Sequence, residues 1–279
     1  MAYTEDVSSV ASPKTPSPPS VLPPRRSLKA RLAVWYRRTA LNPYWLDLKN
    51  LRMAVESLAP QASGRMLDVG VGERPYSALF APYVSHYYGL EYPPACDNLN
   101  PGITQNVSHL QGAVDVWGDG HHLPFRSGEF DTALCLEMLE HVPDPDRVAG
   151  EIARALRPGG KLLLTVPFVA PMHAVPYDFY RYTREGIVAL VQAAGLEVVS
   201  CKARGNYALA TGTLTAQWML RAFAARHEHR DGSVSLSRWR APFVLPLIAL
   251  VQGIYALAGR FSSDTNASLG WTVVARKPA

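Results

Sequence analysis

The sequence has few cysteines and few charged residues. Its 279 residues include three cysteines, and 18% of them are charged. Cys96, Cys135 and Cys201 have neither metal-ligand spacing nor the density of a disulfide framework, so we interpret them as small apolar core residues. No apolar segment follows Met1, which predicts that no secretory signal peptide is present and that the protein is cytoplasmic.

Signatures of nucleic-acid binding are also lacking. The sequence has no zinc-finger spacing, no ribonucleoprotein aromatics and no helix-turn-helix pattern, and its net charge of +5 is modest, so we expect no nucleic-acid partner. One run is basic without an acid, and it comprises Arg25, Arg26, Lys29, Arg31, Arg37 and Arg38. This run either forms a solvated helix on the domain or lies on an anionic membrane surface.

Proline, in contrast, is abundant and concentrated near the N-terminus. Residues 1–27 are rich in Pro and Ser, which predicts a disordered tail. The pattern then predicts a basic helical segment over 28–60, a core over 61–207, an apolar helical insertion over 208–269 and a closing strand over 270–279.

Strand and helix patterns alternate through most of the chain. Apolar runs predict strands at 65–69, 87–90, 113–116, 132–136, 161–166, 196–200 and 271–275. One intervening helix has a predicted cap at Asp144, Pro145 in its first turn, and a stop at Pro158-Gly159-Gly160. The alternation predicts an α/β fold: a doubly wound, Rossmann-like, seven-stranded sheet with helices on both faces.

A glycine-containing turn follows the first predicted strand. Gly70 and Gly72 allow the backbone to approach a ligand at the sheet edge where doubly wound folds bind nucleotides. Glu91 ends the second strand, where a carboxylate can accept hydrogen bonds from ribose hydroxyls. Asp119 follows the third strand and can accept from an adenine amino group, while Leu123 or Phe125 can cover the ring. Each feature alone is as typical of an ordinary turn or a solvated acid, so the evidence is their order.

These ordered motifs resemble those of class I S-adenosylmethionine-dependent methyltransferases. The matching stretches are LDVGVG, GLEY, GDGHHLPF, EFDTALCLEMLEHVPDP and ALRPGGKLLLTVP, in that order. The resemblance implies S-adenosylmethionine as cofactor, with Asp68, Gly70 and Gly72 around its methionine part, Glu91 at the ribose and Asp119 at the adenine. Where the family commonly has a third glycine, this chain has Arg74-Pro75, a replacement that can change the shape of the loop.

Two acids and a histidine follow the fourth predicted strand. The segment from Glu137 to His141 is similar to the corresponding part of ubiquinone-pathway O-methyltransferases, where acids and a histidine lie beside the transferred methyl group. The resemblance places Glu137 at the cofactor. Helical spacing would put Glu137, Glu140 and His141 on one side, as a general base, a divalent metal site or a set of loop hydrogen bonds. We expect an active-site position and assign no metal.

Aromatic and polar residues crowd the segment after the fifth strand. It resembles the acceptor loop of uncharacterised bacterial methyltransferases often linked to cell-surface sugars or lipids. Tyr177, Asp178 and Arg181 are predicted to bind substrate, although a packed aromatic corner is the alternative. His141 or His173 is the candidate base because an imidazole titrates near neutral pH.

The sequence thus predicts methyl transfer to an oxygen or nitrogen of a small-molecule or lipid- or sugar-linked acceptor. Two alternatives stay open: a catalytically silent cofactor-binding or membrane-scaffold protein, and an NAD-dependent oxidoreductase whose glycine fingerprint Arg74-Pro75 disrupts. The uncharged run 241–259, flanked by arginines, predicts peripheral contact with the inner membrane surface, or else packing on the domain or in a dimer interface.

Overall fold

A computed structural model describes residues 35–36, 38–93, 112–228 and 234–279. Residues from Tyr36 to Ala279 belong to one compact unit. The predicted tail, Cys96 and all of the basic run except Arg38 lie outside the described residues.

The unit is built on a seven-stranded sheet whose strands lie in the order β3-β2-β1-β4-β5-β9-β6. Its strands are β1 Gly64–Val69, β2 Val84–Glu91, β3 Val116–Trp117, β4 Phe130–Leu136, β5 Leu156–Pro167, β6 Glu197–Arg204 and β9 Gly270–Arg276. The pairs among β1 to β5 are parallel, whereas β9 runs antiparallel between β5 and β6. The doubly wound seven-stranded prediction is confirmed, with an antiparallel closing strand.

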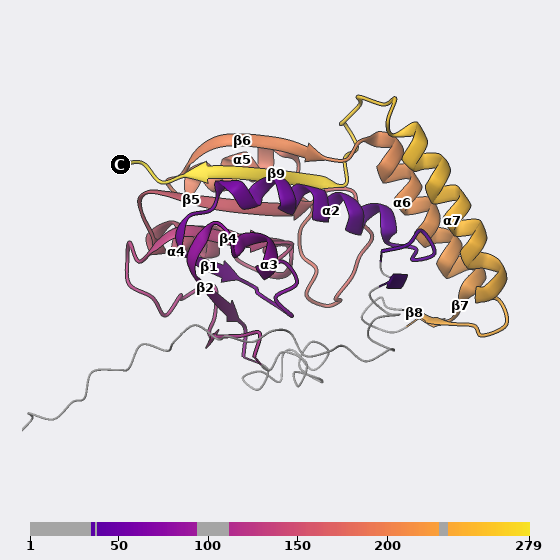
Figure 1. Ribbon diagram of the computed structural model, residues 1–279, viewed down its shortest axis with the longest axis horizontal. Coiled ribbons are helices and arrows are strands. Elements are labelled where there is room, and N and C mark those ends of the chain that lie inside the picture. The colour runs from indigo at the N-terminus through magenta and orange to yellow at the C-terminus, as the bar shows by residue number, and fades with distance from the viewer. Residues whose placement is uncertain (1–34, 37, 94–111, 229–233) are drawn as a thin grey trace, which may run out of the picture. The chain divides into compact units, whose positions relative to one another are not determined.

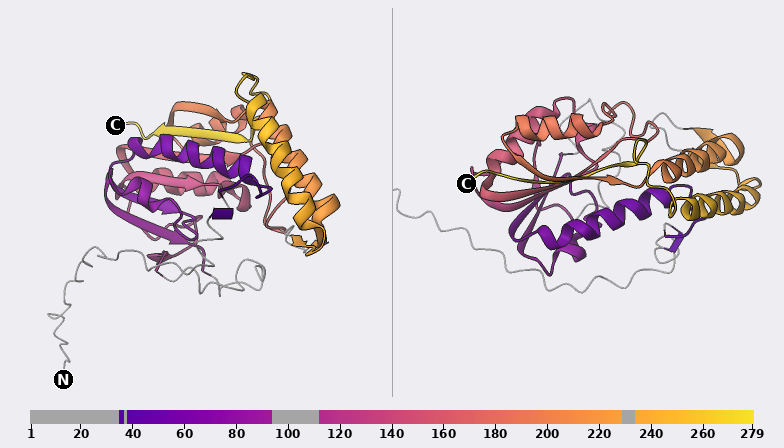
Figure 2. Two further views of the ribbon diagram at one scale, coloured as in Figure 1. Left: turned by 45° about the vertical axis from the view of Figure 1, so that its right-hand side comes forward. Right: turned by 90° about the horizontal axis from the view of Figure 1, so that it is seen from above.

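Helices cover both faces of the sheet (Figures 1 and 2). One apolar cluster joins the strands to α4 Pro145–Ala155 and α5 Arg184–Ala193. The other joins them to α2 Trp45–Leu58, the 3-10 helix η1 Ala59–Gln61 and α3 Ser77–Phe80. Successive residues of β4 alternate between the two clusters, Cys135 in the first and Leu134 in the second. Both faces of the strand are therefore buried, as its continuous apolar sequence predicts.

The start of α4 follows the predicted pattern and its end does not. The Asp144 side chain accepts a hydrogen bond from the Arg147 N–H at 3.1 Å, which confirms the cap. The helix ends at Ala155 and β5 begins at Leu156, before the Pro-Gly-Gly sequence that we expected to stop the helix. Residues 157–160 instead form a bulge in β5, where a Cβ on Gly160 would lie 2.8 Å from the Arg157 carbonyl oxygen.

A helical hairpin connects β6 to β9. It comprises α6 Tyr207–Met219, the π-helix η4 Leu220–Ala224, β7 Ala225–Glu228, β8 Val234–Leu236 and α7 Ala241–Ala258. Figures 1 and 2 show α6 and α7 side by side, and a third apolar cluster lies between them. The helical insertion predicted over 208–269 corresponds to α6 and α7, with α6 beginning at Tyr207 after the cap residue Asn206. The β7–β8 pair within the insertion was not predicted.

Candidate active site

The glycine turn joins the ends of β1 and β2. Gly70 and Val71 both donate their N–H to the Leu90 carbonyl oxygen, at 2.9 and 3.1 Å. Gly70 has φ +80°, and a Cβ there would lie 2.7 Å from Cγ of Met138. The turn therefore requires glycine at position 70 for both conformation and space, and it packs directly against the segment that carries His141.

Arg74 stands where the family commonly has a third glycine, and its backbone adopts a conformation that glycine favours. Its φ is 56°, in the left-handed region that glycine favours. Its guanidinium pairs with Asp115 and lies 4.9 Å from the centre of the Tyr87 ring. Asp115 also accepts the Gly89 N–H at 2.7 Å. These contacts hold an arginine in the unfavourable conformation. The Asp115 partnership was not predicted, because the two residues are distant in sequence.

Asp68 lies at the end of β1 and is buried. The Tyr87 hydroxyl of neighbouring β2 donates a hydrogen bond to its carboxyl. Burial raises the pKa of Asp68 to about 7, although the Tyr87 hydrogen bond opposes the shift. Its predicted contact with the methionine part of the cofactor remains a prediction.

Glu91 and Asp119 meet the requirements of a nucleoside site. The Glu91 carboxylate accepts the Gly72 N–H at 2.8 Å and the Tyr92 N–H at 3.0 Å. A carboxylate has about four acceptor positions, so two remain for ribose hydroxyls. A Cβ on Gly72 would meet nothing within 4 Å. One oxygen of Asp119, Oδ1, binds both the backbone and the ring of His121, which leaves Oδ2 for an adenine amino group. The residues present therefore fit S-adenosylmethionine.

Leu123 is buried in the cluster shared with α4, and its N–H donates to Glu151 at 2.8 Å. Its side chain contributes to the apolar core between the sheet and α4. Contact between Leu123 and an adenine ring stays a prediction.

Glu137 takes part in a buried ion-pair network. The Arg204 guanidinium donates to Glu137 at 2.8 Å and to Asp47 of α2 at 2.6 Å, and its side chain is 1% exposed. Burial raises the pKa of Glu137, and Arg204 opposes this shift. The network ties the end of β4 to β6 and α2. Its members are too distant in sequence for spacing to reveal it, and cofactor binding by Glu137 stays a prediction.

The predicted helical face around Glu137 is corrected by the structure. Glu137 has φ 48°, and only the 3-10 helix η3 Leu139–His141 follows it. Because the left-handed residue breaks the helical path, Glu137 does not share a helix face with Glu140 and His141.

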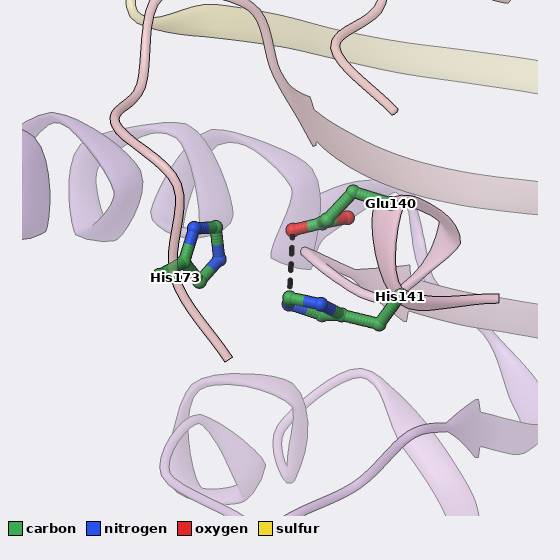
Figure 3. A group of neighbouring side chains, drawn as sticks. All are labelled: Glu140, His141 and His173. Carbon is green, nitrogen blue, oxygen red and sulfur yellow. Dashed lines mark ion pairs between the residues drawn. The ribbon is translucent and has the colours of Figure 1, made fainter. Parts of the chain in front are cut away.

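His173 joins Glu140 and His141 instead (Figure 3). The two imidazole rings are perpendicular, with centroids 4.8 Å apart. The His141 Nε2 atom lies 3.7 Å from Glu140 Oε1. One potential ligand atom from each of the three residues falls within 4.8 Å of the others, so this group could hold a metal ion. His173 lies beside His141 because the loop after β5 returns to η3. Spacing along the sequence does not predict this contact.

Burial sets the protonation of this cluster. The Glu140 side chain is 0% exposed, and among the described residues neither carboxyl oxygen has a hydrogen-bond partner. Burial, together with the nearby Glu137, raises the pKa of Glu140 well above its ordinary value. Burial also lowers the pKa of His141, although its hydrogen bond to Tyr177 opposes the shift. Burial thus favours the protonated form of the Glu140 carboxyl and the neutral form of the His141 imidazole.

An ion pair between Asp178 and Arg181 holds the loop after β5 in its conformation. Asp178 accepts two bonds from Arg181, at 2.6 and 2.7 Å, and one from the His173 N–H at 2.8 Å. The remaining Arg181 N–H groups donate to carbonyl oxygens of residues 170, 171 and 180. All five guanidinium donors are therefore used within the loop. The pair positions His173 in this conformation, while substrate contact by Tyr177, Asp178 and Arg181 stays a prediction.

The sheet order, the glycine turn and the acids at the strand ends define a class I, Rossmann-like methyltransferase fold. Residues 44–201 match the methyltransferase domain family, so the chain belongs to this family. It is a member of the class I S-adenosylmethionine-dependent methyltransferases.

Curated relatives match over about half of their own length. A ubiquinone biosynthesis O-methyltransferase of Xanthomonas oryzae is 33% identical over 131 residues, covering 45% of this chain and 50% of the relative. An uncharacterised methyltransferase of a Mycobacterium species is 34% identical over 100 residues, covering 36% of this chain and 37% of the relative.

Solved structures support the fold. A chain from the complex between the Haloferax volcanii Trm112 methyltransferase activator and a candidate methyltransferase superposes with a TM-score of 0.52. It is 16% identical, and the match covers 91% of this chain and 98% of that one. At this identity the likeness concerns the fold alone.

Proposed function

We propose that this protein transfers a methyl group from S-adenosylmethionine to an oxygen or nitrogen of a small-molecule or lipid- or sugar-linked acceptor, with His141 as the general base. The observation that carries the proposal is the position of His141. Met138, three residues before His141, packs on the Gly70 turn, and this contact supports a position for the His141 imidazole near the sheet edge that we assign to the cofactor.

Cofactor binding is assigned to the turn and the two acids. When bound, S-adenosylmethionine supplies a methyl group that an acceptor lone pair can attack. Glu91 would accept bonds from the ribose hydroxyls, and Asp119 from the adenine amino group. Gly72, which faces open space, leaves room for a ligand beside the backbone. Holding the reacting atoms in line accounts for most of the catalysis in this scheme.

Proton removal is assigned to one atom of His141. The Tyr177 carbonyl can only accept a hydrogen bond, so the proton of a neutral His141 resides on Nδ1, 2.7 Å away. Nε2 therefore holds the free lone pair. The acceptor's O–H or N–H proton would move to Nε2 as its oxygen or nitrogen bonds to the methyl carbon, while the bond from that carbon to sulfur breaks and leaves its electron pair on sulfur. His173, perpendicular to His141, is the second candidate for contact with the acceptor.

A transfer assay with radiolabelled S-adenosylmethionine and fractionated cell extract tests the proposal. Label is expected in one acceptor fraction with wild-type protein, and at least a hundredfold less with His141→Ala, since general-base loss costs about 10² to 10⁴ in rate. Ser57→Ala, an exposed change on α2, is the matched control. If cofactor binds but no acceptor fraction is labelled, the catalytically silent alternative replaces this proposal.

A further inference from the structure

The α6–α7 hairpin has an apolar surface that no other described residue covers. Six side chains of α7 and the residues just after it are between 51% and 85% exposed: Phe243, Leu247, Leu250, Ile254, Leu257 and Phe261. Their alternating spacing of four and three residues places them in one stripe along the helix. We call these six residues the outer face of α7. Soluble monomers rarely expose apolar patches of this extent.

The opposite side of α7 is firmly docked on the unit. Ile248 is buried against α6, and Gln252 is buried as well. The Gln252 amide donates to the carbonyl oxygens of Ala40 and Asn42, at 2.8 and 2.9 Å, and accepts the Leu46 N–H at 3.2 Å. The inner side of α7 is therefore already packed and hydrogen-bonded within the unit, and only the outer face is available to bind another surface.

Arginines flank the outer face along the chain, and exposed tryptophans belong to the same hairpin. Residues 238–261 contain three arginines and no carboxylate. Arg238 and Arg240 precede α7, and Arg260 follows it, all three exposed. Trp239, between the first two, is 87% exposed, and Trp218 of α6 is 60% exposed. Tryptophan favours the boundary between water and lipid, and arginine at the same depth can reach phosphate groups.

The composition of the outer face favours lipid over a second copy of this chain. A helix seam between soluble proteins is normally flanked by charged residues. The other exposed positions of α7, however, are Pro242, Pro246, Gly253 and Ala258. Pairing two copies through this face would also bring arginines together with few carboxylates to match them. Anionic lipid headgroups supply the complementary charge.

If the outer face of α7 contacts lipid, the helix lies along the membrane surface rather than across the membrane. By length and composition α7 is apolar enough to cross a membrane. However, its inner side is bound to the unit through Gln252, and the chain continues from it into β9, between β5 and β6. A crossing would remove both sets of contacts, whereas an interfacial helix keeps them.

We propose that the outer face of α7, with Trp218 and Trp239, docks this protein on anionic phospholipid membranes. The proposal goes beyond methyl transfer and does not depend on which acceptor is used.

Flotation of the full-length protein with vesicles tests the proposal without cofactor or acceptor. Wild type is expected to float with phosphatidylglycerol–phosphatidylcholine vesicles at low salt and less at high salt, because salt screens the arginines. Leu250→Glu should lower the ratio of vesicle-bound to free protein at least about tenfold, since it removes a leucine that would be buried in lipid and adds a charge. Met53→Glu, an equally charged change at an exposed position of α2, should float like wild type.

Two results would overturn the proposal. One is equal flotation of wild type and Leu250→Glu. The other is failure of wild type to float with the anionic vesicles. If wild type does not float and is a dimer in sedimentation equilibrium that Leu250→Glu dissociates, the outer face is assigned to a second copy. Because position 250 is exposed, matching thermal unfolding of the variant and wild type would show that the fold is intact.

Discussion

His141 and Tyr177 are joined by a hydrogen bond of 2.7 Å from the imidazole Nδ1 to the backbone carbonyl oxygen. This bond fixes the tautomer of the proposed base. Burial holds the pKa of His141 below its ordinary value of 6.5, so the free base predominates at neutral pH and is lost only on acidification through the lowered pKa. We expect kcat to stay level from pH 8 to about 6.5 and to fall below it.

The pH profile of kcat, with an acceptor identified by the labelling assay, checks this prediction. His141→Ala should lower kcat by about 10² to 10⁴ and abolish the acid limb, while cofactor affinity stays within about twofold. His173→Ala should lower kcat but keep the limb. We expect a chelator to change nothing. Inactivation by chelator, reversed by a divalent ion, would instead assign the cluster of Glu140, His141 and His173 to a metal.

The positions of the strands along the chain could be predicted because each buried strand has its own apolar run. The closing strand and the glycine turn could be predicted because the residues that identify each of them are contiguous in sequence. The end of α4 was not, since Pro158-Gly159-Gly160 is as compatible with a bulged strand as with a helix stop. Only the pairing of β4 with β5 decides between them.

The candidate site depends more on contacts that the fold creates. His141 was recognisable from its motif, yet its neighbour proved to be His173 rather than Glu137. Arg204, which binds Glu137 and Asp47, lies at the end of β6 with no motif around it. Spacing reports neighbours along one helix or strand, whereas these pairs form where separate strands end at one edge of the sheet.

Glu91→Ala should weaken S-adenosylmethionine binding. The carboxylate is assigned to the ribose hydroxyls, and loss of a charge-assisted hydrogen-bond partner costs roughly 1.5 to 3 kcal/mol, or about 10- to 150-fold in Kd. Isothermal titration calorimetry measures it, with S-adenosylhomocysteine as a second ligand and NAD as a ligand expected not to bind. Glu56→Ala, on the surface of α2, serves as control. Unchanged affinity in Glu91→Ala would remove the ribose assignment.

Substitution of Arg74 tests whether the backbone of the glycine turn is strained. Arg74→Ala and Arg74→Gly both lose the Asp115 ion pair and the contact with Tyr87, but only glycine adopts φ 56° without strain. Arg74→Gly should therefore be more stable than Arg74→Ala by about 1 kcal/mol. Urea unfolding at matched pH measures the difference. Equal stability of the two variants would mean that the turn relaxes when Arg74 is replaced.

The buried carboxyl of Asp68 should make stability depend on pH. Its pKa is about 7 in the folded protein and near 3.8 when unfolded, so the folded state retains the proton to higher pH. The contribution is fully present below pH 3.8 and is lost as pH rises through about 7, by an amount on the order of 4 kcal/mol. Asp68→Asn cannot ionise, while its amide oxygen can still accept from the Tyr87 hydroxyl. The free energy of unfolding of wild type relative to Asp68→Asn should therefore fall between pH 5 and 7 and level off above about pH 7, as measured by urea unfolding at each pH. A difference that stays constant over this range would show that Asp68 is already ionised in the folded protein at pH 5, held by Tyr87 and the nearby Arg74 despite its burial.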